Sequence, residues 1–174
     1  MLSFILQKAG YFYFHNRTGS NLERGIISEL IKEVKLSGLP KNRIGLWEID
    51  EAVLPKVVNK LKTKIVILTN LFRDQLDRYG EIDILANKWQ KALKKLPKKT
   101  IVVLNADDPV VASLGKNLQR QVFYFGLRDQ SIGKKEPAHA SDATMCPNCL
   151  KPLNYKTCFI SHLGIYSCSA CGQI

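Results

Sequence analysis

Four of the five cysteines in this 174-residue chain form two Cys-x-x-Cys pairs near its C-terminal end. Each pair can present two thiolates from one tight turn, and two such pairs supply the four soft ligands that zinc prefers in a tetrahedral site. The sequence therefore predicts a small zinc ribbon, with reduced thiols or an iron–sulfur cluster as alternatives. The predicted zinc ligands are Cys146, Cys149, Cys168 and Cys171.

Two residues between the pairs also have side chains that bind metals. His162 is a candidate alternate ligand, although four thiolates already fill a tetrahedral site. We interpret Cys158 as a small thiol outside the metal set. Short strands at residues 153–159 and 164–167 are expected to form a hairpin between the two pairs.

A second set of chemically capable residues follows three apolar runs. In open α/β sheets, ligands bind beyond the carboxyl ends of the strands, and carboxylates gathered there suit Mg²⁺ that carries a phosphorylated ligand. Glu48 carries the most weight, because a carboxylate within an apolar strand needs a partner. The candidates are Glu48 near the end of the first run, with Asp50 and Glu51 directly after it, Asn70 and Gln75 after the second run, and Asn105, Asp107 and Asp108 after the third.

The same residue types also cap helices. Asp108 stands directly before Pro109, a pattern that fits the start of a helix. For any single residue, capping is the simpler interpretation. Three strand ends with the same chemistry nevertheless favour a shared ligand site.

Four apolar runs must position these residues, at 44–49, 64–69, 100–104 and 122–125. They are nearly continuous rather than alternating, which is typical of strands covered on both faces in a parallel sheet. Helices are expected at 21–36, 51–61, 81–96 and 109–118, and within the first nine residues. This alternation predicts an α/β fold, with a mostly parallel sheet flanked by helices.

The residue composition changes after residue 126, which suggests a second, smaller unit. Residues 127–144 are polar and are interpreted as a linker. We therefore expect a main domain at residues 1–130 and the zinc ribbon at residues 138–174.

Composition narrows the class of protein. Hydrophobic residues make up 45% of the chain, too many for a disordered protein, and no apolar stretch reaches the roughly 18 residues of a membrane span. No secretory signal is recognisable, so a cytoplasmic location with reduced thiols is expected.

The net charge of +11 favours an anionic partner such as a nucleotide or a nucleic acid. A ribbon that binds nucleic acid is therefore an alternative function, although Lys151 and Lys156 are the only basic residues from Cys146 onward. A protein whose main role is to bind a partner through the ribbon is a third interpretation.

Several motifs together resemble a known family. The segment at residues 69–80, TNLFRDQLDRYG, and the later segment 105–109, NADDP, resemble the central ATPase domain of Mur ligases. Residues 48–52 are similar to the segment that carries the family's magnesium-binding glutamate. Residues 16–22 and 124–126, with the four-cysteine ribbon, resemble the MurT branch, the ligase subunits of lipid II isoglutaminyl synthase.

The resemblance implies an activity and a set of partners. MurT-type proteins use ATP and Mg²⁺ to activate the α-carboxyl of D-glutamate in lipid II as an acyl phosphate. Ammonia from a glutaminase partner, GatD, then gives D-isoglutamine. By the same resemblance, Glu48 helps to hold Mg²⁺, Asn105 contacts adenine, Asp107 and Asp108 shape that pocket, and the loop with Asn70 and Gln75 borders the phosphates.

Three departures from the family pattern matter. Gln75 stands where Mur ligases usually have a histidine. No Gly-x-x-x-x-Gly-Lys-Ser/Thr phosphate loop occurs in the chain, and the family's loop would precede Met1. The family's C-terminal domain would follow residue 174. We therefore expect no measurable ligase activity from this chain alone, and we name Lys88 and Lys91 as candidates for the carbamylated lysine of many Mur ligases.

Overall fold

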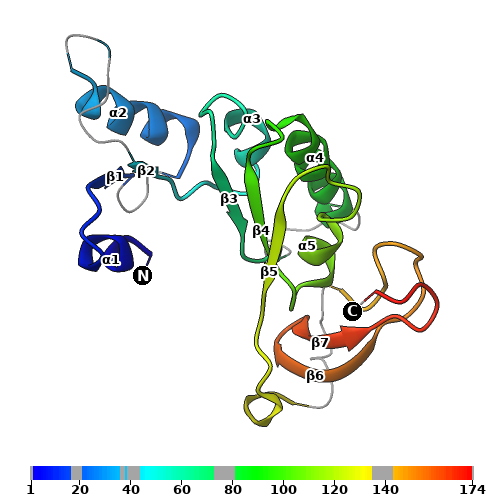
Figure 1. Cartoon of the computed structure of the whole chain (residues 1–174). Coiled ribbons are helices and arrows are strands. Elements are labelled where there is room, and N and C mark those ends of the chain that lie inside the picture. Colours follow the sequence, from blue (N-terminus) through cyan, green and yellow to red (C-terminus); the bar gives the residue numbers. More distant parts are fainter. Residues whose placement is uncertain are drawn as a thin grey trace. The chain divides into compact units, whose positions relative to one another are not determined.

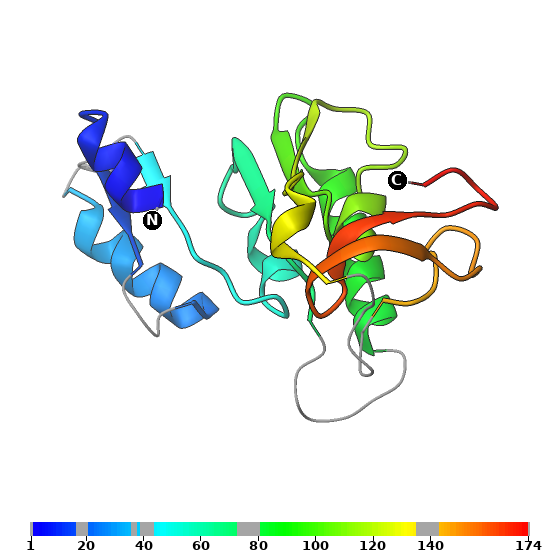
Figure 2. The ribbon, with the colours of Figure 1, turned by 90° about the horizontal axis from the view of Figure 1, so that it is seen from below.

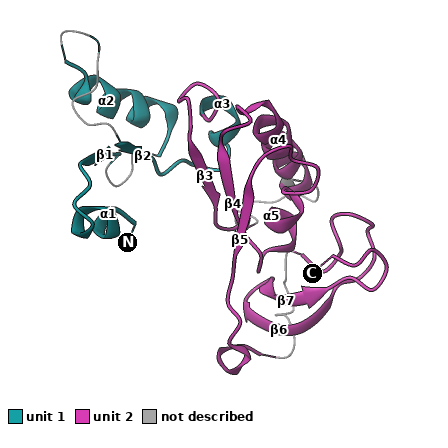
Figure 3. Cartoon of the chain, in the orientation of Figure 1, with its two compact units in different colours: residues 1–57 teal, residues 58–174 magenta. Residues whose placement is uncertain are grey.

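A computed structural model of the chain describes residues 2–16, 21–35, 38, 44–72, 81–134 and 143–173. The chain divides into two compact units, residues 1–57 and 58–174 (Figure 3). The expected boundary near residue 130, between a main domain and the zinc ribbon, stays a prediction. The ribbon belongs to the same compact unit as the larger sheet.

The first unit contains α1 (Leu2–Lys8), β1 (Tyr13–His15), α2 (Glu23–Glu33), β2 (Ile44–Leu46) and α3 (Leu54–Val57). β1 and β2 pair in parallel, with Phe14 opposite Gly45. A side chain at that position would crowd two aromatic rings, because an added Cβ would lie 2.9 Å from Trp47 Nε1 and 3.2 Å from the Phe14 ring. β1 was not expected, since a run of three residues is too short to give a periodic signal.

The second unit is built on a three-stranded parallel sheet in the order β3-β4-β5 (Figure 1). Its strands are β3 (Ile65–Leu68), β4 (Ile101–Asn105) and β5 (Val122–Phe125). α4 (Glu81–Lys95) connects β3 to β4, and α5 (Pro109–Ser113) connects β4 to β5. Parallel neighbours joined by helices confirm the α/β class.

One face of this sheet forms the core of the second unit. Val102 and Leu104 of β4 are wholly buried, and each side chain of that kind contributes about 1.5–3 kcal/mol when it leaves water. α4 and α5 lie on the same side of the sheet (Figures 1 and 2). α4 contributes the buried residues Trp89, Ala92 and Leu93 at helical spacing, and the buried Leu96 follows directly after the helix. The expectation of burial on both faces is wrong for β3, where Ile65 and Ile67 are exposed.

After β5 come a short 3-10 helix, η1 (Gln130–Ile132), and, later in the chain, an antiparallel hairpin. The hairpin consists of β6 (Asn154–Ile160) and β7 (Leu163–Ser167), with Cys158 opposite Gly164. Gly164 tolerates no side chain, because an added Cβ would overlap the Thr157 carbonyl oxygen. Among the helices of the described residues, none is long and apolar enough to cross a membrane.

Candidate functional site

The carboxyl ends of β3 and β4 are joined by the side chain of Asn105. Its Nδ2 donates to the Thr69 carbonyl oxygen at 2.7 Å, and its Oδ1 accepts from the Asp107 backbone N–H at 3.0 Å. Asn105 is 7% exposed, and Asn70, the residue after Thr69, is partly buried. Parallel neighbouring strands thus bring Asn70, Asn105 and Asp107 to one edge of the sheet, and a shared ligand site at that edge stays a prediction.

Asp108 is the N-cap of α5 and is wholly buried. Its Oδ1 accepts from the backbone N–H groups of Val110 and Val111, at 2.9 and 3.1 Å. Its Oδ2 accepts from the Leu71 backbone N–H at 2.8 Å, which ties the segment after β3 to the start of α5. The capping interpretation is therefore confirmed for Asp108. Its side chain holds the backbone of the turn in place and is not part of the exposed surface of the site.

Asp107 holds the other side of the same turn. Both of its carboxylate oxygens lie within hydrogen-bonding distance of the Leu127 backbone N–H, at 2.9 and 3.2 Å. Burial raises the pKa of the Asp107 carboxyl above its usual value, and the bond from Leu127 partly offsets that effect. Asp107 therefore links the end of β4 to the segment that follows β5.

Glu48 belongs to the first unit. It lies beyond the end of β2, not within a strand, and is exposed. Glu48 is therefore not the carboxylate within an apolar strand that the sequence predicts. Its backbone is nevertheless fixed, because Asn16 Nδ2 donates to the Glu48 carbonyl oxygen at 2.7 Å and Asn16 Oδ1 accepts from the Glu48 N–H at 2.9 Å. A role for Glu48 in holding Mg²⁺ stays a prediction.

Three further residues named from the sequence also stay predictions. Gln75 lies outside the described residues. Lys88 and Lys91 are exposed on α4, and nothing in the geometry selects either of them for carbamylation.

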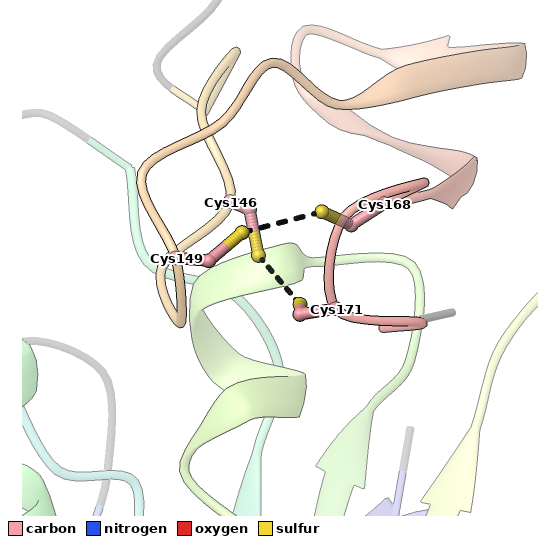
Figure 4. Close-up of side chains that lie close together, drawn as sticks. All are labelled: Cys146, Cys149, Cys168 and Cys171. Carbon is pink, nitrogen blue, oxygen red and sulfur yellow. Dashed lines mark hydrogen bonds between the residues drawn. The ribbon is translucent and has the colours of Figure 1, made fainter.

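The four predicted zinc ligands come together at the C-terminal end of the second unit (Figure 4). Their sulfur atoms all lie within 4.8 Å of one another, with 3.5 Å between Cys146 and Cys171 and 3.4 Å between Cys149 and Cys168. A tetrahedron of Zn–S bonds separates its sulfurs by about 3.8 Å. The donor set therefore fits one zinc ion, and bound zinc would cross-link the two turns of the ribbon.

Local backbone geometry aims these thiols at a common centre. The Leu150 N–H donates to the Cys146 carbonyl oxygen at 2.9 Å, and the Gly172 N–H donates to that of Cys168 at the same distance. Gly172 has a φ of 72°, in the left-handed region that glycine adopts without strain.

The thiol pKa values differ within the cluster. Backbone N–H groups of Cys171 and Ala170 point at the Cys168 sulfur and lower its pKa to about 7, against the opposing effect of burial. At Cys149 the Lys151 N–H lowers the pKa, but burial and the neighbouring sulfurs outweigh it and raise the value to about 12. Burial raises the pKa of Cys146. Of these three thiols, Cys168 therefore ionises most readily.

His162 does not lie in the cysteine cluster. It is wholly buried at the turn between β6 and β7, and its Nε2 lies 3.2 Å from Asp108 Oδ2. The Phe72 ring meets it edge-on, with 5.0 Å between ring centroids. Sequence reasoning considered His162 only as a metal ligand and missed this contact, because nothing in its neighbours along the chain indicates a partner 54 residues away.

The comparison with protein families establishes the class. The family described as the Mur ligase middle domain matches residues 43–166, which include the three-stranded sheet, the Asp107–Asp108 turn and all but the last residue of the β6-β7 hairpin. The chain therefore belongs to the Mur ligase middle domain family.

Relatives within that family narrow the branch. The chain is 35% identical over 158 residues to MurT subunits of lipid II isoglutaminyl synthase (glutamine-hydrolyzing) from Staphylococcus aureus and Streptococcus pneumoniae. These alignments cover 91% and 90% of this chain and 34% of each relative, so the chain spans about a third of their length. A pseudomurein peptide ligase type C from Methanothermus fervidus shares the fold, with a TM-score of 0.56 and 26% identity over 74% of this chain and 25% of that chain.

Proposed function

We propose that this chain is the ATP-binding middle domain of a MurT-type ligase that amidates the D-glutamate α-carboxyl of lipid II. The observation that carries the proposal is the 35% identity to MurT subunits over nine-tenths of the chain. The arrangement of polar groups beyond β3 and β4 supports it, because that edge is where open α/β sheets bind nucleotides.

The proposed reaction has two displacements. The substrate carboxylate attacks the γ-phosphorus of ATP, which forms an acyl phosphate and releases ADP. Ammonia then attacks the carbonyl carbon, inorganic phosphate leaves, and the amide of D-isoglutamine remains. Phosphoryl transfer of this kind depends on positioning and on neutralised charge, so the protein's task is to hold the nucleotide and Mg²⁺ in place.

The residues of this chain contribute to positioning. The Asn105 amide has one N–H left after its bond to Thr69, and we assign that hydrogen to the adenine base. Asp107 and Asp108 keep the turn after β4 in shape through their bonds to backbone N–H groups. Glu48 is the proposed Mg²⁺ ligand, and Asn70 borders the phosphates. The four ribbon cysteines hold structural zinc, and the partner that supplies ammonia is a glutaminase of the GatD type.

Binding of the nucleotide can be tested on the 174-residue chain by NMR titration with Mg·ATP. We expect the largest chemical-shift changes at Asn70, Asn105 and Asp107. Glu48→Gln should weaken Mg·ATP binding by about tenfold, since one charge-assisted contact is lost. Asp83→Asn, which removes an exposed carboxylate on α4 that is not a candidate ligand, is the matched control and should bind as the parent chain does. Equal affinities for the Glu48 and Asp83 variants would contradict the role of Glu48.

The ligase assignment needs a test in its working context. A chimera of Staphylococcus aureus MurT that carries this chain in place of the aligned segment should support glutamine-dependent amidation of lipid II with GatD. We expect no amidation from the 174-residue chain alone, which contains no phosphate-loop motif. A chimera that folds, binds GatD and binds ATP but does not amidate would contradict the assignment. Binding of duplex DNA with a steep salt dependence would instead favour the nucleic-acid alternative.

A further inference from the structure

Three consecutive residues at the start of α5 are each held by a different part of the ribbon. The Gly164 N–H donates to the Asp107 carbonyl oxygen at 2.9 Å. His162 Nε2 lies 3.2 Å from Asp108 Oδ2, and Gln173 Nε2 donates to the Pro109 carbonyl oxygen at 3.0 Å. These contacts join the hairpin turn and the second cysteine pair to the turn between β4 and α5.

We propose that the ribbon is a positioning element for the β4–α5 turn, with His162 and Gln173 as the positioning residues, so that the metal state of the ribbon sets the order of the turn. The effect of the ribbon on the order of the turn follows from these contacts alone. That an ordered turn also favours nucleotide binding rests on the function proposed above.

His162 is itself held from several sides. The Tyr155 hydroxyl lies 3.0 Å from the His162 carbonyl oxygen and 2.7 Å from that of Ala143, which ties the backbone of the hairpin turn to the segment before the first cysteine pair. Phe72 contacts the ring from the segment after β3. With the ring held in this way, Nε2 has a defined direction toward the Asp108 carboxylate.

The group that His162 contacts in this direction is the Asp108 carboxylate. Its carboxylate already accepts from three backbone N–H groups, those of Leu71, Val110 and Val111. A wholly buried carboxylate needs donors on every side, because its transfer from water is costly. The His162 N–H supplies the fourth donor. Loss of this donor is expected to loosen the contacts at Leu71 and at the first turn of α5 together.

Gln173 connects the turn to the metal cluster. Its Oε1 lies 3.4 Å from Cys146 Sγ and accepts from Asn148 Nδ2 at 2.6 Å, while its Nε2 reaches Pro109. Its carbonyl oxygen also accepts from the Cys168 N–H at 2.8 Å, within the second cysteine turn. Residues just outside a metal's ligand set commonly orient the ligands. Here the same residue also contacts the first residue of α5.

The test is hydrogen exchange on the full 174-residue chain loaded with zinc. His162→Leu removes the donor to Asp108, and His162→Gln keeps an N–H near the position of Nε2. We expect His162→Leu to lower the protection of the Leu71, Val110 and Val111 amides by about tenfold or more, and His162→Gln to restore most of it. Ile160→Ala, an exposed change in the same hairpin, is the control and should leave these amides unchanged.

Gln173→Ala provides a second variant at a partly buried position, in case His162→Leu does not fold. It should lower protection at Val110 and Val111 while one zinc per chain remains bound, as read by native mass spectrometry. Unchanged protection in both variants, with zinc still bound, would overturn the proposal.

Removal of zinc with a chelator is the third arm. We expect the amides of the turn to lose protection while Val102 and Leu104, in the centre of the sheet, keep theirs. Loss of protection throughout β4 would overturn the proposal, since the ribbon would then support the whole unit rather than the turn. Hydrogen exchange is measured without a nucleotide. Failure of Mg·ATP to bind would therefore count against the proposed function only, and the exchange results would still decide whether the ribbon positions the turn.

Discussion

Asn105 Nδ2 donates to the carbonyl oxygen of Thr69 at 2.7 Å, so the last residue of β4 closes the end of the neighbouring strand β3. The same side chain accepts from the Asp107 N–H, and it is 7% exposed. Asn105, which we propose contacts adenine, is thus also a structural link between two strands and the turn that follows. Its amide is oriented before any ligand arrives.

We therefore expect Asn105→Ala to destabilise the chain even without a nucleotide. The change leaves the Thr69 carbonyl oxygen and the Asp107 N–H without their partner, at a cost of about 1–3 kcal/mol in the free energy of unfolding. Urea denaturation measures this difference. Thr69→Ala, which alters an exposed side chain and keeps the carbonyl oxygen, should stay within about 0.5 kcal/mol of the parent chain. Equal stabilities of the two variants would contradict the linking role of Asn105.

Asp108→Asn tests whether Asp108 is only a helix cap or also accepts hydrogen bonds from Leu71 and His162. Asparagine caps helices about as well as aspartate, so a simple cap would tolerate the change. At Asp108, however, the new amide N–H₂ would face the donors of Leu71 and His162. We expect a loss of about 1–3 kcal/mol in the free energy of unfolding, measured by urea denaturation.

A double-mutant cycle provides the control for Asp108→Asn. Combined with His162→Leu, the Asp108→Asn change should cost less than it does alone, because one of the opposed donors is gone. Strict additivity of the two changes would show that the pair is not coupled.

Gly126→Ala should disturb the other side of the turn. A Cβ on residue 126 would lie 2.6 Å from Asp107 Oδ1, so the carboxylate must leave its position near the Leu127 N–H. We expect a loss of about 1–3 kcal/mol in stability and weaker binding of Mg·ATP. Thermal unfolding and the NMR titration measure the two effects. Leu127→Ala changes an exposed side chain one residue away and should alter neither stability nor Mg·ATP binding. Equal effects of the Gly126 and Leu127 variants would contradict the predicted clash with Asp107.

Zinc affinity should rise with pH, because zinc binds thiolates and must displace any thiol protons. Cys168, with a pKa of about 7, loses its stabilised thiolate as the pH falls through that value, whereas Cys149, at about 12, is protonated throughout the neutral range. Binding should therefore release close to one proton more at about pH 6 than at about pH 8. Calorimetry in buffers of different ionisation enthalpy measures the number of protons released. The same number at both pH values would contradict a Cys168 thiol that ionises near pH 7.

The metal set itself can be checked with a matched pair of variants. Cys168→Ser should abolish stoichiometric zinc binding, because a neutral hydroxyl replaces a thiolate. Cys158→Ser should retain one zinc per chain, since Cys158 is buried in β6 outside the four-sulfur cluster. Zinc content by elemental analysis gives the answer. Loss of zinc from the Cys158 variant would place that thiol in the site.

Local patterns in the chain predicted much of the fold. Apolar runs gave the positions of β3, β4 and β5, and the spacing of Trp89, Leu93 and Leu96 indicated α4. β1 was missed and α3 is shorter than expected, because short elements depend on their neighbours more than on their own periodicity. Glu48 was placed within a strand, although β2 ends before it.

The sequence by itself determined the chemistry available to this protein: four thiols at zinc spacing, amide and carboxylate groups after apolar strands, and a segment typical of Mur ligases. Only the tertiary structure decided how those groups are used. It placed His162 against Asp108 and Gln173 against Pro109, across 54 and 64 residues of chain. Such contacts depend on how a hairpin packs on a sheet, and that packing follows from the sum of many burial and hydrogen-bond terms rather than from any local pattern.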